Sequence, residues 1–232
     1  MLISAVNVED TQDSREVKRN ASEKQAEKRA EKKRRGLVKP KKVSFEKPGN
    51  FLYPVPPVMV SCACEGYAPN ILTVAWAGTI CSDPPMVSIS VKPERHSYEM
   101  IKASGEFVVN LTSKKLAYAA DFCGCRSGKD IDKFEACKLT AAPCEHVSAP
   151  MILESPVSLE CKVTGIIPLG SHDMFLAEVV GVQVDQQYLD RKGTFHMESA
   201  GLIAYSHGRY YELGKMKGSF GFSVKKKTKA RK

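Results

Sequence analysis

A cluster of basic and hydroxyl side chains lies in the first half of the chain. Just before a segment predicted to be helical, the sequence carries Lys92, Arg95, His96 and Ser97. The first turn of a helix presents free backbone N–H groups and a partial positive charge, and an arginine binds an anion through two parallel hydrogen bonds. The spacing is therefore typical of a phosphate site. An ordinary charged turn in which Ser97 caps the helix explains the same residues.

Other common catalytic motifs do not occur in the sequence. It contains no Walker loop, GxGxxG turn, HExxH pair or GxSxG elbow, so the usual nucleotide, zinc-protease and hydrolase sites have no support. The eight cysteines include two CxC pairs, 62–64 and 123–125, and this spacing is poor for structural zinc. We expect reduced structural thiols and no metal. A redox or metal role is the alternative, with Cys123 or Cys125 in a glycine-containing loop as its best candidate.

The elements that must position the basic cluster are mostly short strands. Apolar or alternating runs predict strands at 58–63, 71–77, 86–91, 106–111, 158–167, 174–185 and 196–204. A turn is expected at 66–70 and a chain break at 82–85, so that 71–77 and 86–91 form a hairpin. Short helices are expected at 98–103, closed by Gly105, and at 116–122. This order predicts a mainly β fold, a closed antiparallel barrel with helical decorations, and argues against a doubly wound sheet.

The charge of the chain divides unevenly, and it indicates the domain limits. Residues 1–50 hold 14 Lys/Arg and 8 Asp/Glu, and residues 225–232 hold 6 Lys/Arg and no acid. The intervening residues 51–224 therefore hold 15 basic and 18 acidic residues, a net charge of −3. We expect a basic extension at 1–50, helical or disordered at 8–35 and a linker at 36–50, then a folded domain at 51–222 and a basic tail at 223–232. Nucleic-acid contact is restricted to the two basic segments, because the body has no excess positive charge.

Membrane insertion is not expected. No apolar run approaches the ~18–20 residues that span a bilayer. The apolar start at 1–6 is too short for the core of a signal peptide, and acidic residues follow it. We therefore expect a cytoplasmic protein.

Several motifs occur in a fixed order along the body. They are Pro-Asn-x-x-Thr-x-Ala-Trp at 69–76, Asp-Pro-Pro-x-Val at 83–87, Arg-x-Ser-Tyr at 95–98, Gly-Glu-Phe-Val-Val-Asn at 105–110, and the segments 127–134 and 170–179. Together they resemble the flavin reductase-like, FMN-binding split-barrel family, close to its flavoredoxin branch, over roughly residues 51–222. The resemblance implies an antiparallel Greek-key split barrel. It also implies a homodimer that binds FMN non-covalently near the subunit interface.

The resemblance also implies roles for individual residues. The isoalloxazine edge would contact the backbone of Asn70, Leu72, Thr73, Val74, Ala75 and Trp76. The ribityl chain would contact Ser88 and Ser90, the phosphate would contact Lys92, Arg95 and Ser97, and Asn110 would complete the pocket. The segment that packs over the flavin would include Ser127 and Lys129, and the side chain facing the flavin or nicotinamide would be His172.

Some of these assignments have a structural alternative. The 127–134 segment also fits a surface turn that caps a helix, His172 fits a structural loop histidine, and Trp76 fits core packing. The resemblance favours an NAD(P)H-dependent flavin reductase, with His172 orienting the substrate ring or transferring a proton. An electron carrier of the flavoredoxin type, supplied by a redox protein and without direct NAD(P)H activity, is the alternative. A binding module whose basic segments contact nucleic acid is the third reading.

Overall fold

The computed structural model describes residues 23–24, 27 and 41–225. The chain divides into two units, Met1–Asn50 and Phe51–Lys232. In the first unit, residues 23–24 and 27 are helical and exposed, and residues 41–50 are exposed and form neither helix nor strand. The remainder of the extension expected at 8–35, and the end of the tail at 226–232, lie outside the described residues.

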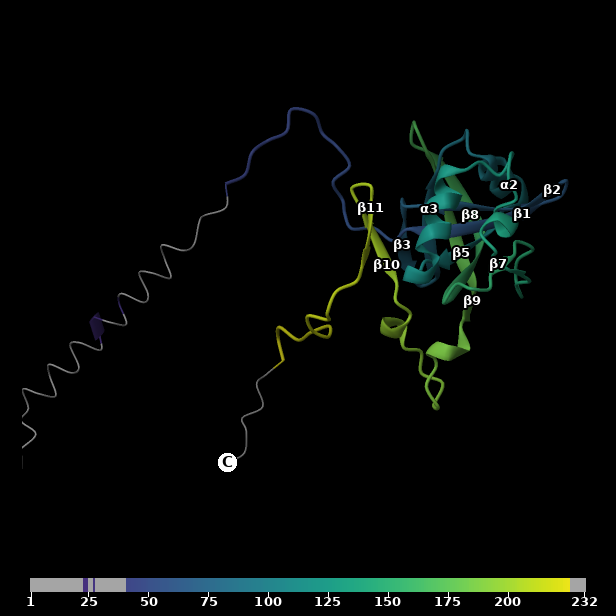
Figure 1. Cartoon of the computed structure of the whole chain (residues 1–232). Coiled ribbons are helices and arrows are strands. Elements are labelled where there is room, and N and C mark those ends of the chain that lie inside the picture. The colour runs from purple at the N-terminus through teal and green to yellow at the C-terminus, as the bar shows by residue number, and fades with distance from the viewer. Residues whose placement is uncertain (1–22, 25–26, 28–40, 226–232) are drawn as a thin grey trace, which may run out of the picture. The chain divides into compact units, whose positions relative to one another are not determined.

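Seven antiparallel strands form the main sheet of the second unit (Figure 1). They are β1 (Val58–Cys64), β2 (Tyr67–Val74), β3 (Ala77–Ser82), β4 (Pro85–Val91), β5 (Glu106–Leu111), β8 (Val157–Pro168) and β9 (Asp173–Val184). Their order in the sheet is β2-β1-β5-β8-β9-β4-β3. Neighbouring strands in this order are hydrogen-bonded, and every pair is antiparallel.

The sheet closes into a barrel at the bend between β2 and β3. These two strands are consecutive in the chain but lie at opposite edges of the sheet, so the two residues between them, Ala75 and Trp76, must bring the edges together. The backbone N–H of Ser90 in β4 donates to the carbonyl of Trp76, at 2.9 Å. The closed antiparallel barrel predicted from the sequence is confirmed, and a doubly wound sheet is excluded.

Smaller elements connect and cover the barrel strands. The helices are α2 (His96–Ser104), η1 (Lys114–Leu116), α3 (Ala117–Cys125), α4 (Lys133–Ala136), η2 (Gln186–Tyr188) and η3 (Met197–Ser199). The remaining strands form two-stranded sheets, β6 (Ala141–Ala142) with β7 (Met151–Ile152) and β10 (Ile203–Ser206) with β11 (Arg209–Glu212).

Alternation along the strands builds the barrel interior. In β4, Val87, Ile89 and Val91 are buried in the interior cluster, and Ser88 and Ser90 between them are only partly buried. Because successive side chains of a strand point to opposite faces, the serines lie on the outer surface.

A second apolar cluster forms outside the barrel wall. Met59 of β1 and Ile71 of β2 pack there against Ala120 of α3 and Phe134 of α4. This packing fixes α3 and α4 over the outer face of β1 and β2, where burial of apolar surface stabilises them.

Several local expectations were wrong. The segment expected as one strand at 71–77 divides at Ala75–Trp76, and residues 67–70, expected in a turn, belong to β2. The hairpin partner of β4 is therefore β3, not residues 71–77. The strand expected at 196–204 is mostly a 3₁₀ helix and loop, with only its end in β10. Ser97 does not cap α2, because Arg95 holds the N-cap position and makes no side-chain cap bond.

Candidate functional site

A cavity of 230 Å³ lies where β2, the start of α2 and the loop after α3 meet. We call it the Arg95 cavity. Its lining residues are Asn70, Leu72, Lys92, Glu94, Arg95, His96, Ser97, Arg126, Ser127, Gly128 and Lys133.

Backbone elements from distant parts of the sequence hold the Arg95 side chain over this cavity. A turn at residues 92–95 leads from β4 into α2, which places Arg95 immediately before the helix. Its Nη1 donates to the carbonyl of Gly124, in the last turn of α3, at 3.1 Å. On the other wall, Asn70 Nδ2 donates to Ser97 Oγ at 2.8 Å, and both side chains are buried. The hydroxyl of Ser97 therefore orients Asn70 as well as facing the cavity.

Lys133 is a cavity residue that the sequence analysis did not select. Its side chain is only 2% exposed. Its Nζ donates to the carbonyl of Ile71 at 2.7 Å and to that of Cys123 at 2.8 Å. Both acceptors are backbone carbonyls, which carry no full negative charge. Burial lowers the pKa of Lys133, and the neighbouring Arg95 guanidinium acts in the same direction.

Positive charge dominates the lining of the Arg95 cavity. Four cations, Lys92, Arg95, Arg126 and Lys133, line it together with one carboxylate, Glu94. That carboxylate already pairs with Lys92, at 3.4 Å. A buried cation without a counter-ion is costly, and an anion in the cavity offsets this cost. The donor set fits a phosphate group.

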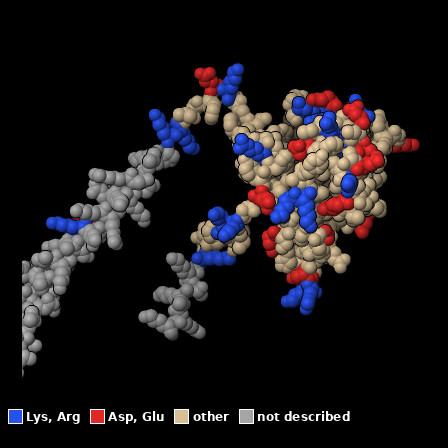
Figure 2. Space-filling model, in the orientation of Figure 1, with Lys and Arg blue, Asp and Glu red and all other residues tan. Residues whose placement is uncertain are grey.

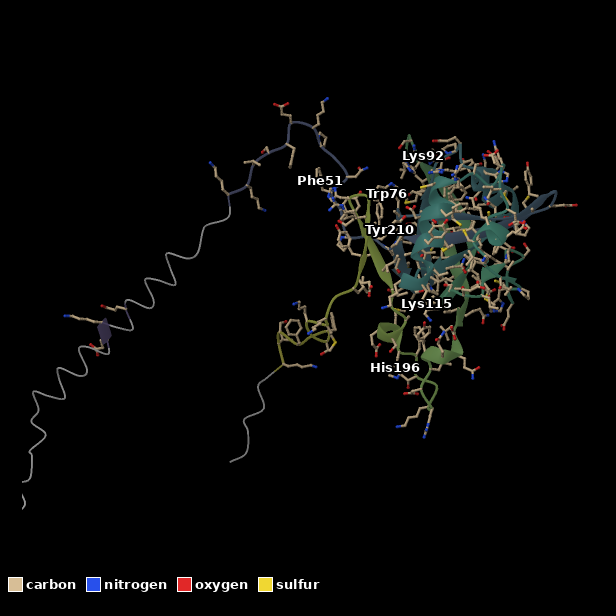
Figure 3. All side chains as sticks on the ribbon, in the orientation of Figure 1. Phe51, Trp76, Lys92, Lys115, His196 and Tyr210 are labelled. Carbon is tan, nitrogen blue, oxygen red and sulfur yellow. The ribbon has the colours of Figure 1, made fainter. Side chains whose placement is uncertain are left out.

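A smaller cavity of 130 Å³ adjoins the first at the barrel closure; both share Leu72, Lys92 and Arg95. We call it the Trp76 cavity, and Figure 3 labels two of its residues, Trp76 and Lys92. Its lining residues are Leu72, Thr73, Val74, Ala75, Trp76, Ser90, Val91, Lys92, Arg95 and His172.

The β8–β9 turn brings His172 to the Trp76 cavity. His172 directly precedes Asp173, the first residue of β9. Asp173 pairs with Val91 at the end of β4. Ser171 Oγ and His172 Nδ1 are 2.9 Å apart, within hydrogen-bond distance. The imidazole is partly buried and faces the same space as Trp76. Tyr53 packs against the Trp76 ring at 6.0 Å between centroids.

A third cavity, of 510 Å³, adjoins the Arg95 cavity and shares Glu94, Arg95, His96 and Gly128 with it. We call it the Tyr67 groove. Its lining residues are Tyr67, Pro93, Glu94, Arg95, His96, Glu99, Gly128 and Lys129.

Most of the residues selected from the sequence meet around these three cavities. The Arg95 and Trp76 cavities contain Asn70, Leu72, Thr73, Val74, Ala75, Trp76, Ser90, Lys92, Arg95, Ser97, Ser127 and His172. Lys129 lines the Tyr67 groove. Ser88 lies on the same outer face as Ser90 but lines none of the three.

Asn110 is held in the protein interior, and its amide has no group left for a ligand. Its Nδ2 donates to Met59 O, Ser61 Oγ and Val108 O, and its Oδ1 accepts from Ile152 N–H and the Ser158 hydroxyl. The side chain is completely buried and lines none of the three cavities. We therefore do not retain Asn110 as a cofactor contact.

The cysteine pair considered for redox chemistry lies at the end of α3, not in a loop. Cys123 is buried, and its Sγ lies 4.0 Å from that of Cys137. Burial raises the pKa of the Cys123 thiol to about 12, which leaves little reactive thiolate near neutral pH. Cys125 is exposed.

Comparison with known proteins confirms the family. The chain belongs to the family defined by the flavin reductase-like domain, which matches residues 51–214. The flavoredoxin of Desulfovibrio vulgaris (Miyazaki F) has the same fold, with a TM-score of 0.73 and 30% identity over 80% of this chain and 100% of that chain.

Two curated relatives match part of the chain. A protein of Aeropyrum pernix is 29% identical over 166 residues, which cover 71% of this chain and 62% of that protein. The NADPH-flavin oxidoreductase of Streptomyces viridifaciens is 26% identical over 125 residues, 53% of this chain and 63% of the relative. The match therefore spans less than two thirds of either relative.

The surface of the barrel agrees with the uneven distribution of charge along the sequence, in which residues 51–224 have no excess of basic side chains. Figure 2 shows acidic and basic side chains intermixed over the visible face of the barrel. Among the described residues, no helix has the length and apolar character needed to cross a bilayer.

Gly128→Ala is expected to narrow the Arg95 cavity and to weaken flavin binding by at least about tenfold. A Cβ at position 128 would overlap Asn70 Oδ1 and lie 2.5 Å from Asn70 Cγ. Asn70 cannot turn away without losing its buried hydrogen bond to Ser97. Titration of the apoprotein with FMN measures the effect. Gly78→Ala, where nothing lies within 4 Å of the added carbon, is the matched control, and equal affinity of the two variants would contradict this geometry.

Proposed function

We propose that this protein is an FMN-binding oxidoreductase that takes hydride from NADH or NADPH and passes electrons through FMN to free flavin or another acceptor. The observation that carries the proposal is the junction of two cavities. The cation-lined Arg95 cavity fits a phosphate, and the Trp76 cavity beside it is bordered by residues 72–74 of β2 and by Trp76. A phosphorylated flavin needs both environments at adjacent positions.

The residues of the site would divide the work of binding between them. Lys92, Arg95 and Lys133 would hold the phosphate by charge-assisted hydrogen bonds. Backbone groups of residues 70–76 would bind the polar edge of the flavin ring, and Ser90 on the outer face of β4 would contact the ribityl chain. Thr73 contributes through its backbone, because its hydroxyl donates to the Ala120 carbonyl at 2.5 Å. Bound FMN supplies a reversible acceptor of two electrons.

His172 is the residue that we assign to the substrate side of the site. It lies on the β8–β9 turn and faces the Trp76 cavity. An imidazole there can stack against a nicotinamide ring or donate a hydrogen bond to it, which aligns the donor for hydride transfer. The Streptomyces viridifaciens NADPH-flavin oxidoreductase supports a nicotinamide donor.

An electron carrier of the flavoredoxin type is the second candidate. The match to the Desulfovibrio vulgaris flavoredoxin over that protein's full length favours it. In this case a redox protein would take the place of the nicotinamide as electron donor, and His172 would have no substrate to orient.

Anaerobic addition of NADH or NADPH to the FMN-loaded protein separates these two functions. We expect the yellow flavin absorbance to bleach rapidly, and His172→Gln to slow this bleaching by at least about tenfold, because the donor loses its orientation. His196→Gln is the control, since His196 is a partly exposed histidine outside the three cavities. Slow or absent bleaching of the yellow wild-type protein would indicate the carrier, and a protein that binds no flavin would contradict both.

The flavin site is proposed to lie entirely within a domain at 51–222. Every residue that lines the three cavities falls between Tyr67 and His172. The basic segments at 1–50 and 223–232 are then outside the site, and any contact with nucleic acid would belong to them.

A homodimer in the cytoplasm is the assembly and location that we propose. Exposed apolar side chains lie along β8 and β9, namely Ile166, Ile167, Val182 and Val184. They lie near the two ends of the β8–β9 hairpin, and exposed apolar side chains of this kind are candidates for burial at a subunit interface. The eight cysteines are free thiols, which fits a reducing compartment.

A further inference from the structure

A tyrosine of α2 is joined to the turn that carries His172. The Tyr98 hydroxyl donates to Asp173 Oδ2 at 2.5 Å, and 75 residues separate the two partners in the sequence. Asp173 is the first residue of β9 and directly follows His172. The hydrogen bond therefore connects a helix on one side of the site to the residue next to His172.

The Tyr98 side chain is fixed in its place by packing. It is 5% exposed, and its ring makes an edge contact with Phe175 of β9, at 5.5 Å between centroids. The Lys102 ammonium lies over the same ring, 5.5 Å from its centroid. The hydrogen bond to Asp173 raises the pKa of Tyr98 to about 12, and burial acts in the same direction. The phenol therefore stays protonated near neutral pH and remains a donor.

The turn that precedes Asp173 is exposed. Residues 169–171 are all exposed, and Gly170 has φ of +97°, a conformation that glycine adopts without strain. The backbone N–H of Leu169 donates to the His172 carbonyl at 3.0 Å, but this bond lies within the turn. An exposed turn of this kind is mobile unless a separate element holds it. The Tyr98 hydrogen bond provides such an attachment next to His172.

The first turn of α2 also carries groups of the Arg95 cavity. The backbone N–H of Tyr98 donates to the carbonyl of Arg95 at 2.9 Å. Ser97, between these two residues, accepts from Asn70 Nδ2 at 2.8 Å. One turn of helix thus contacts both the candidate phosphate site and, through Tyr98, the turn that carries His172. This arrangement fixes the two parts of the site relative to each other.

We propose that Tyr98 is a positioning residue, which acts through Asp173 to hold the His172 imidazole at the substrate side of the flavin site. The inference rests on the proposed function and adds a residue to it. Tyr98 lines none of the three cavities, so its effect on the reaction passes through His172. Hydride transfer requires a narrow range of geometries between donor and acceptor, and loosening the turn lowers its rate.

Anaerobic reduction of the FMN-loaded full-length protein by NADH or NADPH tests the proposal in four proteins: the wild type, Tyr98→Phe, His172→Gln and the double variant. Phenylalanine keeps the packed ring and removes only the hydroxyl. We expect Tyr98→Phe to slow flavin reduction by at least about fivefold when His172 is present, and by less than about twofold in His172→Gln, where no imidazole remains to be positioned. The Kd for FMN should change by less than about twofold.

Variants of Asp173 test the other partner of the hydrogen bond. Asp173→Ala removes the acceptor and should slow flavin reduction about as much as Tyr98→Phe. Asp173→Asn keeps an oxygen that accepts from the phenol, so it should be slowed less than Asp173→Ala. Tyr118→Phe removes the hydroxyl of an exposed tyrosine of α3 and is the matched control. Denaturant titration of each variant shows whether it is folded at the temperature of the assay.

The comparison between the two backgrounds decides the outcome. A merely structural role for Tyr98 would slow reduction by the same factor with and without His172, and that result overturns the inference, as does unchanged reduction in Tyr98→Phe. Both results leave rapid bleaching of the wild-type protein in place. Absent bleaching of the yellow wild-type protein would instead overturn the nicotinamide-dependent function and this inference with it.

Discussion

Lys133→Met is expected to raise the Kd for FMN by roughly 30- to 150-fold, which corresponds to about 2–3 kcal/mol for a charge-assisted contact. Lys133 is almost fully buried and lines the Arg95 cavity, and its ammonium group donates to two backbone carbonyls. A phosphate would give this cation its counter-ion. Methionine keeps most of the length and apolar character of the lysine stem but cannot attract an anion.

The titration of Lys133 provides a second measurement, because it changes the free energy of unfolding and the FMN affinity in opposite directions as the pH rises. Its pKa in the folded protein lies below the ordinary value of 10.5. Between these two values the unfolded chain binds more protons at this side chain than the folded one, so the contribution of Lys133 to the free energy of unfolding of the apoprotein rises with pH. Buried thiols such as Cys123, whose pKa is raised, contribute the opposite slope. FMN affinity falls over the same window, because the folded protein loses the cation. Both contributions are absent from Lys133→Met, so they are measured as the difference between the wild type and this variant across the alkaline range.

Control variants separate the charge of Lys133 from its structural role. Lys162→Met replaces an exposed lysine of β8 and should leave FMN affinity unchanged. Lys133→Met also leaves the Ile71 and Cys123 carbonyls without their donor, so its free energy of unfolding should be measured by denaturant titration. A folded Lys133→Met that binds FMN as tightly as the wild type would remove Lys133 from the site.

The parts of the fold that were predictable depend on short-range sequence signals. Alternation in 86–91 and the β-prone run at 106–111 gave β4 and β5 to within one residue, and Gly105, with φ of +69°, ends α2 as expected. The division of 71–77 into two strands has no local signal. It follows from closure, because Ala75 and Trp76 must connect opposite edges of a seven-stranded sheet.

The candidate site, like the fold, was predictable only where the signal is local in the sequence. The motifs selected Ser127 and Lys129 but passed over Lys133 in the same segment. Asp132 caps α4 by accepting from Glu135 N–H at 3.1 Å, a signal readable in the sequence. The burial of Lys133 was not readable, since its acceptors Ile71 and Cys123 come from β2 and α3. The hydrogen bonds that occupy the Asn110 amide were not readable either, since the partners lie in β1, β5, β7 and β8.

Arg95→Ala is the second substitution with a large expected effect, an increase of roughly 30- to 150-fold in the Kd for FMN. Arg95 lines all three cavities, and its guanidinium is held against α3 by the Gly124 carbonyl. Arg191→Ala, an exposed arginine outside the cavities, is the matched control for loss of one positive charge. Unchanged FMN affinity in Arg95→Ala would exclude a direct contact with the phosphate.

The two cations should also be coupled, because Arg95 lowers the pKa of Lys133. Removing the guanidinium removes a like charge, so the pKa of Lys133 should rise and the loss of FMN affinity at alkaline pH should begin at a higher pH in Arg95→Ala than in the wild type. For the same reason the loss of FMN affinity in the double variant should differ from the sum of the two single losses. Neighbouring charges that bind one ligand group do not act independently. Isothermal titration with FMN across pH 7–10.5 measures both effects. An unchanged alkaline limb together with strict additivity would mean that the two cations do not share one phosphate.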